Sequence, residues 1–153
     1  MRLVEHKDAM TILSWETKEE IRRVTRIEAP LSLRMLEALI DEQRNVFDSG
    51  QVRFILCKND SNIPVGMVDL YNIDFVTDFA EVGIVVVDLE HRKKGYATEA
   101  LNIIHRYAVD VLGLICLKSV VGIDNNPSMT LFKGLGYKID VIESNRMGEK
   151  NKV

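Results

Sequence analysis

The stretch that decides the fold runs from Glu81 to Leu101 and reads E-V-G-I-V-V-V-D-L-E-H-R-K-K-G-Y-A-T-E-A-L. Its first half is rich in branched apolar residues, which predicts a buried strand over 79–87. Its second half begins a helix, because Ala97, Leu101 and Ile104 recur at helical spacing. The turn between them is charged while both neighbours are apolar. It is therefore a candidate site as well as a connection.

A strand-to-helix turn of this kind can hold an anion. The first N–H groups of a helix have no partner within the helix and carry partial positive charge. Gly95 has no side chain to block an approaching group, and Ala97 is nearly as small. The cations Arg92, Lys93 and Lys94 add charge around the turn. The pattern indicates a phosphate or pyrophosphate site, although an ordinary solvated turn is the plainer interpretation of the same residues.

The rest of the chain predicts a mixed α/β domain. Four helices are expected. The first lies near 9–13, and the second begins at a Thr17–Glu20 capping box, continues through Ile21, Val24 and Ile27, and stops at Pro30. The third is capped by Ser32 and has an apolar face of Leu36, Leu39, Ile40 and Phe47, and the fourth is capped by Asn126 and stops at Gly136. Strands are expected at 52–58, 63–73, 79–87, 114–123 and 137–142. This order predicts a single domain over residues 1–153 with a mostly antiparallel sheet flanked by helices.

Composition and charge exclude several classes of protein. The apolar fraction is 46% and the charged fraction 28%, an ordinary globular balance. A net charge of −3 and a pI near 5.6 give no basic excess, which argues against nucleic acid as a partner. No apolar run approaches the length of a membrane span, and the N-terminus is not a signal peptide. We therefore expect a cytoplasmic protein in which Cys57 and Cys116 are reduced and buried.

The charged turn belongs to a wider pattern. R-K-K-G-Y-A (92–97) resembles the R/Q-x-x-G-x-G/A signature of the GCN5-related N-acetyltransferases (GNAT). Further segments of that family follow in order, namely V-G-M-V-D-L-Y-N-I (65–73), A-E-V-G-I-V-V (80–86), G-Y-A-T-E-A-L (95–101), L-G-L (112–114) and N-N-P-S-M-T-L-F-K-G-L-G-Y (125–137). The resemblance covers roughly Arg2 to Tyr137. It is nearest to the branch with ribosomal-protein N-terminal and spermidine acetyltransferases, and it implies a sheet splayed at a bulge.

The resemblance also implies a ligand and its site. Acetyl-CoA would be the co-substrate, with no metal, and its pyrophosphate would lie on the turn. The residues implied for the coenzyme are Val85, Val86 and Val87, with a backbone N–H for the thioester carbonyl, the turn residues Arg92, Lys93, Lys94, Gly95, Tyr96, Ala97 and Thr98, and Asn125, Ser128 and Phe132. The three histidines are scattered and give no metal-ligand spacing.

Three departures from the family pattern affect these expectations. Lys93 stands where the family usually has glycine, which should change the turn only slightly. The segment from Glu81 to Gly95 is one residue longer than usual, so the bulge would be enlarged or displaced. After Tyr137 there is room for one terminal strand but hardly for two. We therefore expect the acceptor side to be open or completed by a second subunit, as in a homodimer.

The implied reaction is acetyl transfer from a thioester to an amine. An alkyl amine with a pKa near ~10 is mostly protonated at neutral pH, so a proton must be removed. Glu81 is the first candidate base, where the family often has a glutamate that orders water, and Asp69 is the second, as base or as acceptor anchor. Phe132 replaces a family tyrosine and cannot protonate the leaving thiolate. Ser128 could position a water instead.

The acceptor is expected to be a cationic primary amine, either polyamine-like or a peptide N-terminus. Six residues would form an acidic mouth for it: Trp15, Glu16, Glu19, Glu20, Asp69 and Asp74. The competing interpretation is that the two neighbouring glutamates suit a helix N-terminus and that Trp15 is core. A coenzyme-binding module without catalysis is the alternative function. An RNA-binding domain that uses the basic run is disfavoured by the pI.

Overall fold

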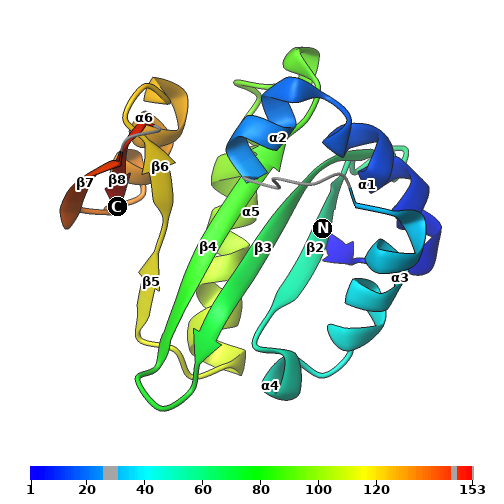
Figure 1. Cartoon of the computed structure of the whole chain (residues 1–153), viewed down its shortest axis with the longest axis horizontal. Helices are drawn as coiled ribbons and strands as arrows, with labels where there is room; N and C mark the ends of the chain where they lie inside the picture. Colours follow the sequence, from blue (N-terminus) through cyan, green and yellow to red (C-terminus); the bar gives the residue numbers. More distant parts are fainter. Residues whose placement is uncertain (26–30, 146–147, 153) are drawn as a thin grey trace.

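The computed structural model describes residues 1–25, 31–145 and 148–152, with side chains up to residue 140 other than 23 and 24. Figure 1 shows a larger sheet with helices on both of its faces and a smaller sheet beside it. The N-terminal helices lie in front of the larger sheet, and the long helix over 96–106, which follows the fourth strand of that sheet, lies behind. This is the mixed α/β architecture predicted from the order of the elements.

The larger sheet has the order β1-β2-β3-β4-β5, and the smaller sheet has the order β6-β8-β7. The strands are β1 (Arg2–Leu3), β2 (Val52–Cys57), β3 (Pro64–Asp74), β4 (Phe79–Val86), β5 (Cys116–Lys118), β6 (Val120–Gly122), β7 (Val141–Asn145) and β8 (Gly148–Lys152). The helices are α1 (Ala9–Glu16), α2 (Glu19–Thr25), α3 (Leu33–Glu42), α4 (Val46–Ser49), α5 (Tyr96–Arg106) and α6 (Asn126–Gly134), with short turns η1 (His6–Asp8), η2 (Leu89–His91) and the π-helical η3 (Tyr107–Val111). Strands β1 to β4 pair antiparallel, and β5 joins β4 in parallel.

Side chains alternate between two apolar cores, one on each face of the larger sheet, as the two-residue period of a strand requires. In β4, Ala80 and Val82 pack into the core that contains α5, whereas Val85 and Val87 pack toward α1 and α3. Trp15 belongs to this second core and is 6% exposed. It is therefore a packing residue, and its expected place in an acidic mouth is wrong.

The predicted strand 114–123 is in fact two strands that belong to different sheets. β5 pairs with β4 only over Phe79–Glu81, and β6 then pairs with β8. Beyond Glu81, β4 keeps β3 on one side and has no ladder partner on the other side within the described ranges. The expected splay of the sheet is present at this point.

The expected bulge in β4 is wrong, because the pairing of β3 with β4 runs without a shift over residues 81–86. The shift lies at the other end of the pair, between Tyr71 and Asp74. Asn72 adopts a left-handed φ of 50° there, a conformation that asparagine tolerates better than most residues. The splay of β4 therefore arises from the departure of β6 and not from an extra residue in β4.

The helix caps of the N-terminal half are partly as predicted. Ser32 caps α3 and accepts a hydrogen bond from the backbone N–H of Met35 at 3.2 Å. Thr17 instead ends α1, and its hydroxyl donates to the carbonyl of Ser14 at 2.7 Å, so the expected capping box is wrong. Ile27 and Pro30 lie outside the described residues.

Two predicted burials also change. Phe47 lies on α4 rather than on the apolar face of α3, is 65% exposed, and packs against the ring of Phe75 at 4.9 Å. Cys57 is buried as expected, but Cys116 is exposed because β5 is an edge strand beyond its short pairing with β4. Both thiols are free.

The terminal segment forms two strands, not one. β7 and β8 pair antiparallel, and β8 also pairs with β6. The predicted strand 137–142 is thus shifted to Val141–Asn145 and gains a partner. The structural reason for expecting a second subunit to complete the acceptor side is thereby removed.

No helix of the described part of the chain is both long enough and apolar enough to cross a membrane.

Gly66 fixes how closely β3 and β4 approach, which yields a stability prediction. A Cβ at this position would lie 2.2 Å from the carbonyl oxygen of Val85, so Gly66→Ala must push the strands apart. We expect a loss of about 3 kcal/mol in the free energy of unfolding, measured by urea denaturation. Gly83→Ala is the matched control, because its Cβ would meet only Tyr71, at 3.5 Å. Equal losses in the two variants would contradict the assigned register.

Candidate active site

The turn before α5 leaves several backbone donors without partners. Gly95 is the N-cap of α5 with a φ of 87°, and it provides no side-chain cap. The first N–H bonded into the helix is that of Glu99, to the carbonyl of Gly95 at 2.9 Å. The N–H groups of Tyr96, Ala97 and Thr98 therefore point out of the helix end. By contrast, Ser32 caps α3 and Asn125 caps α6 with side chains.

Arg92 does not face this turn with its guanidinium. Its Nε donates to the carbonyl of Val86 at 3.0 Å, and its Nη1 pairs with the Glu20 carboxylate. The side chain thus joins the end of β4 to α2. Any contribution of Arg92 to ligand binding at the turn would come through its backbone.

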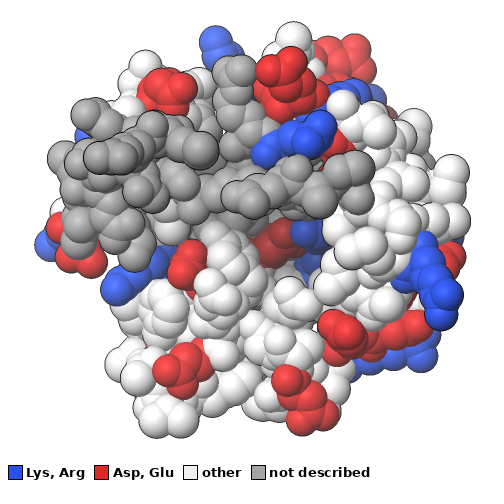
Figure 2. Space-filling view, in the orientation of Figure 1, with Lys and Arg blue, Asp and Glu red and all other residues white. Residues whose placement is uncertain are grey.

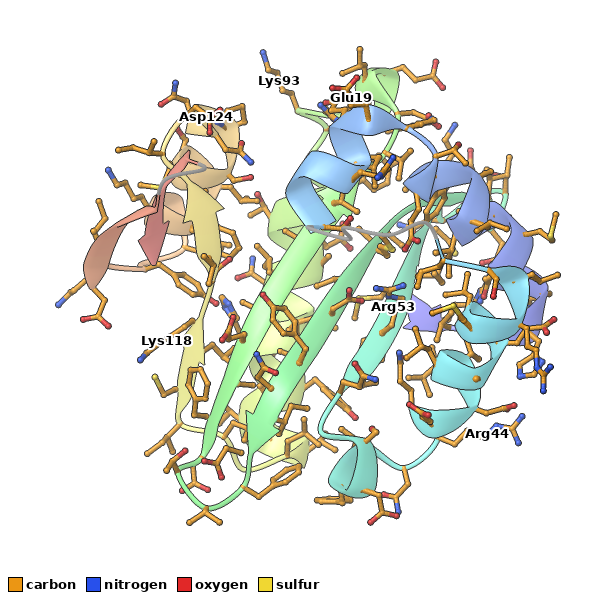
Figure 3. The ribbon with its side chains drawn as sticks, viewed as in Figure 1. Glu19, Arg44, Arg53, Lys93, Lys118 and Asp124 are labelled. Atoms are coloured by element: carbon orange, nitrogen blue, oxygen red, sulfur yellow. The ribbon has the colours of Figure 1, made fainter. Side chains whose placement is uncertain are left out.

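Lys93 and Lys94 are the exposed cations of the turn. Figure 3 shows the Lys93 side chain extending away from the body of the protein, beyond the end of β4. Neither lysine has an ion-pair or hydrogen-bond partner among the described residues. Of the three cations predicted to surround the turn, only Lys93 and Lys94 therefore have free charged groups, because the Arg92 guanidinium is bonded elsewhere.

Lys93 adopts a φ of 59°, a left-handed conformation that costs a lysine about 1 kcal/mol. Lys94 does not. We therefore expect Lys93→Gly to be roughly 1 kcal/mol more stable than Lys94→Gly, since both variants lose one cation and gain the same freedom in the unfolded chain. Thermal unfolding of the two variants measures the difference. Equal stabilities would show that the turn adopts another conformation.

The free edge of β4 lies next to this turn. The backbone N–H of Val87 donates to the carbonyl of Val65 at 3.0 Å, on the side of β3. Because backbone groups alternate between the two sides of an antiparallel strand, the N–H and C=O of Val85 also point toward β3. Ile84 and Val86 then direct theirs to the opposite side, where β5 no longer follows. Of the three predicted valines, Val86 is the one whose N–H faces the splay.

Glu81 lies at the point where the splay begins. It is the last residue of β4 that pairs with β5, opposite Lys118, and its carboxylate accepts a hydrogen bond from the Asn72 side chain at 3.3 Å. The carboxylate is partly exposed and can reach solvent. This geometry suits a carboxylate that takes a proton through water.

Asp69 is already paired. The Nε and Nη2 of Arg53 donate to its two carboxylate oxygens at 2.7 and 2.8 Å. Figure 3 shows the Arg53 side chain on the front face of the sheet, beside α3. Such a fork favours a carboxylate that stays ionised and fixed, so the geometry favours Glu81 over Asp69 as a base. Arg53 was missed in the sequence, although the hairpin register places it opposite Asp69.

The α6 residues take structural positions. Asn125, not Asn126, caps the helix, and its side-chain oxygen accepts from the backbone N–H of Ser128 at 3.2 Å. Phe132 is 2% exposed and packs edge-on against Tyr137 at 4.9 Å. Tyr137 accepts or donates a 2.8 Å hydrogen bond with His105, and burial raises its pKa well above the usual range.

Of the acidic residues expected to form one mouth, Glu16 and Asp69 lie close enough to interact, whereas Asp74 and Glu20 are engaged elsewhere. Asp74 binds the turn between β3 and β4 through Val76 N–H and the Thr77 hydroxyl, which lowers its pKa. Glu20 pairs with Arg92. On the face in Figure 2, acidic and basic side chains are interspersed, so this visible surface is not a field of one sign. Only Glu16 of the six is both a carboxylate and buried, at 5% exposure.

The described residues do not meet the requirements of a metal site. Within the described residues, no group of three or more histidine, cysteine, aspartate or glutamate side chains could hold an ion.

Comparison with known proteins decides the family. The model of the acetyltransferase (GNAT) domain matches residues 1–138. The chain belongs to the GNAT family. The open N-terminus of α5 and the free edge of β4 are therefore features of a GNAT domain, and the resemblance seen in the sequence is confirmed.

Individual GNAT relatives are distant. The N-acetyltransferase 9-like protein of Dictyostelium discoideum is 26% identical over 144 residues, which cover 81% of this chain and 66% of that protein. The spermidine N(1)-acetyltransferase of Vibrio cholerae is 26% identical over 94 residues, covering 61% of this chain and 53% of that protein. The chain thus matches only about half to two thirds of the length of these two relatives.

A solved structure supports the fold over nearly the whole chain. Spermidine N-acetyltransferase from Vibrio cholerae, in complex with CoA and spermine, superimposes with a TM-score of 0.85 at 22% identity. The match covers 99% of this chain and 90% of that one. At this identity the likeness shows the GNAT architecture.

Proposed function

We propose that this GNAT protein transfers an acetyl group from acetyl-CoA to a primary amine that is cationic before reaction. The observation that carries the proposal is the uncapped N-terminus of α5 beside the free edge of β4. One feature suits a pyrophosphate and the other suits the thioester carbonyl. The family assignment supports the same reaction.

The coenzyme would be held by residues of the turn and of β4. The N–H groups of Tyr96, Ala97 and Thr98 would take the pyrophosphate, with Lys93 and Lys94 adding charge. The pantetheine arm would then run along the edge that β4 exposes after Glu81. Asn125 and Ser128, at the N-terminus of α6, would border the arm from the other side of the splay.

The transfer would be direct. The amine nitrogen attacks the thioester carbonyl carbon, a C–N bond forms, and the C–S bond breaks to release coenzyme A as a thiolate. Negative charge on the carbonyl oxygen would be met by the Val86 N–H, which faces the splay. Glu81 would take the amine proton through water, and the thiolate would gain a proton from solvent because Phe132 has no hydroxyl.

The acceptor is proposed to be polyamine-like or a peptide N-terminus. The names of relatives, spermidine acetyltransferases among them, are consistent with a polyamine. A cytoplasmic location is proposed with it, because the free thiols of Cys57 and Cys116 persist in a reducing compartment.

An amine panel tests the proposal. Purified protein is mixed with acetyl-CoA and, in turn, with diamines, triamines, monoamines and short peptides, and thiol release is followed. Amine-dependent release with at least one cationic acceptor is expected. Saturable coenzyme binding without release for any acceptor would favour the alternative, a binding module that has lost catalysis, to which the buried Phe132 lends some support.

A further inference from the structure

Glu16 is a buried carboxyl whose oxygens have no hydrogen-bond partner within the described part of the chain. It is the last residue of α1 and is 5% exposed. Both of its carboxyl oxygens are buried and lack a hydrogen-bond partner among the residues that the structure describes. Leaving an ionised carboxylate in this condition costs several kcal/mol. A buried carboxyl without a partner either stays protonated or is ionised when a bound ligand supplies the missing partner.

The neighbouring charges do not satisfy Glu16. Arg53 and Asp69 act on it electrostatically from β2 and β3, but the Arg53 fork is already taken by Asp69. Burial raises the pKa of Glu16, and Asp69 raises it further, while Arg53 opposes the shift. With all three groups ionised, the cluster has two negative charges and one positive charge. Arg22 lines the adjoining cavity but makes no hydrogen bond to Glu16 among the described residues, so the Glu16 carboxylate has no cation paired with it.

A cavity adjoins this carboxyl and has room for such a cation. Its volume is about 180 Å³, and its lining residues are Leu13, Glu16, Thr17, Arg22 and Leu31. This exceeds the roughly 10–15 Å³ of such space that one water needs. The lining combines one carboxyl and one arginine, Arg22, with two leucines, and the Thr17 hydroxyl donates to the Ser14 carbonyl.

Two ion pairs join the α1–α2 region beside the cavity to the segment that follows β4. Lys18, two residues after Glu16, pairs with Asp88 at 3.1 Å, just beyond the end of β4. Glu20 pairs with Arg92, whose Nε holds the carbonyl of Val86. The junction of α1 and α2 is thus fixed against the end of β4 from which the acetyl group would be presented.

We propose that Glu16 binds an aliphatic ammonium group in this cavity, and that this group is a second amine of the acceptor, which stays cationic while the first is acetylated. The inference rests on the proposed function and narrows its substrate class to diamines and polyamines. A metal ion is a poor fit, since no cluster of three ligating side chains exists among the described residues. An ammonium group has three donors for the two Glu16 oxygens, and methylene groups suit Leu13 and Leu31.

The proposal has a pH dependence whose sign follows from the raised pKa of Glu16. The groups that face Glu16 are Arg53 on β2, Asp69 on β3 and Arg22 on α2. Because the ammonium needs the ionised carboxylate, diamine affinity should rise with pH through the Glu16 pKa and then level off. Where Glu16 is protonated in the free protein, diamine binding should release a proton.

The free protein should show the opposite trend. A carboxyl whose folded pKa is raised favours folding most below its unfolded pKa, and this contribution is lost as pH rises through the folded value. Glu16→Gln removes the ionisation and keeps the shape. We therefore expect this variant to melt higher than wild type at alkaline pH, with the difference vanishing as pH falls toward 4.5, the ordinary Glu value.

The test compares 1,4-diaminobutane with n-pentylamine, which presents a methyl group in place of the second ammonium. Wild type should show a kcat/KM for the diamine at least about tenfold higher, as expected for a buried charge pair. Glu16→Gln should lose most of this preference while binding acetyl-CoA normally. Glu42→Gln, on an exposed glutamate of α3, is the matched control and should keep the preference.

A binding measurement on the wild type needs no variant. Calorimetry of 1,4-diaminobutane with the coenzyme A-saturated protein, in buffers of different ionisation enthalpy between about pH 5 and pH 8, should show proton release that fades as pH rises. No proton release at any pH, or an unchanged diamine preference in Glu16→Gln, would overturn the role of Glu16. Wild type that releases no thiol with any amine would instead overturn the proposed function.

Discussion

Gly95→Asp is expected to weaken acetyl-CoA binding by about a hundredfold or more, because it places a carboxylate where the N-terminus of α5 would hold the pyrophosphate. A Cβ at Gly95 would meet nothing within 4 Å in the free protein. Aspartate tolerates the left-handed φ of 87° better than most residues and suits a helix N-terminus. The variant should therefore fold with a loss of about 1 kcal/mol to backbone strain, and calorimetry with acetyl-CoA should report the loss of affinity.

Gly136→Asp is the matched control for this change. Gly136 has a φ of 91°, and a Cβ there also meets nothing within 4 Å. It lies just after α6, at a helix C-terminus, so an aspartate there should destabilise the protein slightly more than one at Gly95. Acetyl-CoA affinity should nevertheless be retained. If the two variants bind the coenzyme equally well, the pyrophosphate is not held at the N-terminus of α5.

Glu81→Gln is expected to lower kcat on the order of 10²–10⁴-fold, the usual contribution of a general base, with little change in acetyl-CoA affinity. The carboxylate lies where β4 loses β5 and has one side-chain hydrogen bond, from Asn72. Glutamine keeps the size of the side chain but cannot take a proton. Steady-state rates with a saturating diamine, together with a thermal melt to establish folding, measure the effect.

Asp69→Asn separates a base from a structural carboxylate. Because Asp69 holds Arg53 in a two-bond fork, the substitution leaves a largely buried guanidinium without its counter-charge. We expect a loss of about 3 kcal/mol in the free energy of unfolding. If Asp69→Asn is stable but has a greatly reduced kcat, and Glu81→Gln stays active, then Asp69 is the base and Glu81 is not.

Features that rest on local sequence were predicted correctly. The buried strand, the glycine turn and the amphipathic helix around Gly95 are encoded within one continuous stretch, so their order and their open N–H groups could be foreseen. The cap at Ser32 is equally local. These depend on neighbours a few residues apart, for which spacing alone is informative.

Features that rest on distant pairing were not predictable in the same way. The side chain of Arg92 looked like a ligand for phosphate, but it bonds to Glu20, which is 72 positions away in the chain. The strand 114–123 read as continuous, yet β6 leaves β4 to pair with β8. Glu16 read as one carboxylate of an exposed mouth, and only the packing of α1 on the sheet reveals that it is buried.

The central claim is that this GNAT protein joins the acetyl group of acetyl-CoA to an amine, and one mass-balance measurement tests it most directly. Wild-type protein is incubated with acetyl-CoA and 1,4-diaminobutane, and free thiol and N-acetylated diamine are measured in the same samples. The account predicts that both accumulate in equal amounts and that neither forms without the protein. Thiol release that does not depend on the diamine, or coenzyme binding with no acetylated product, would contradict it.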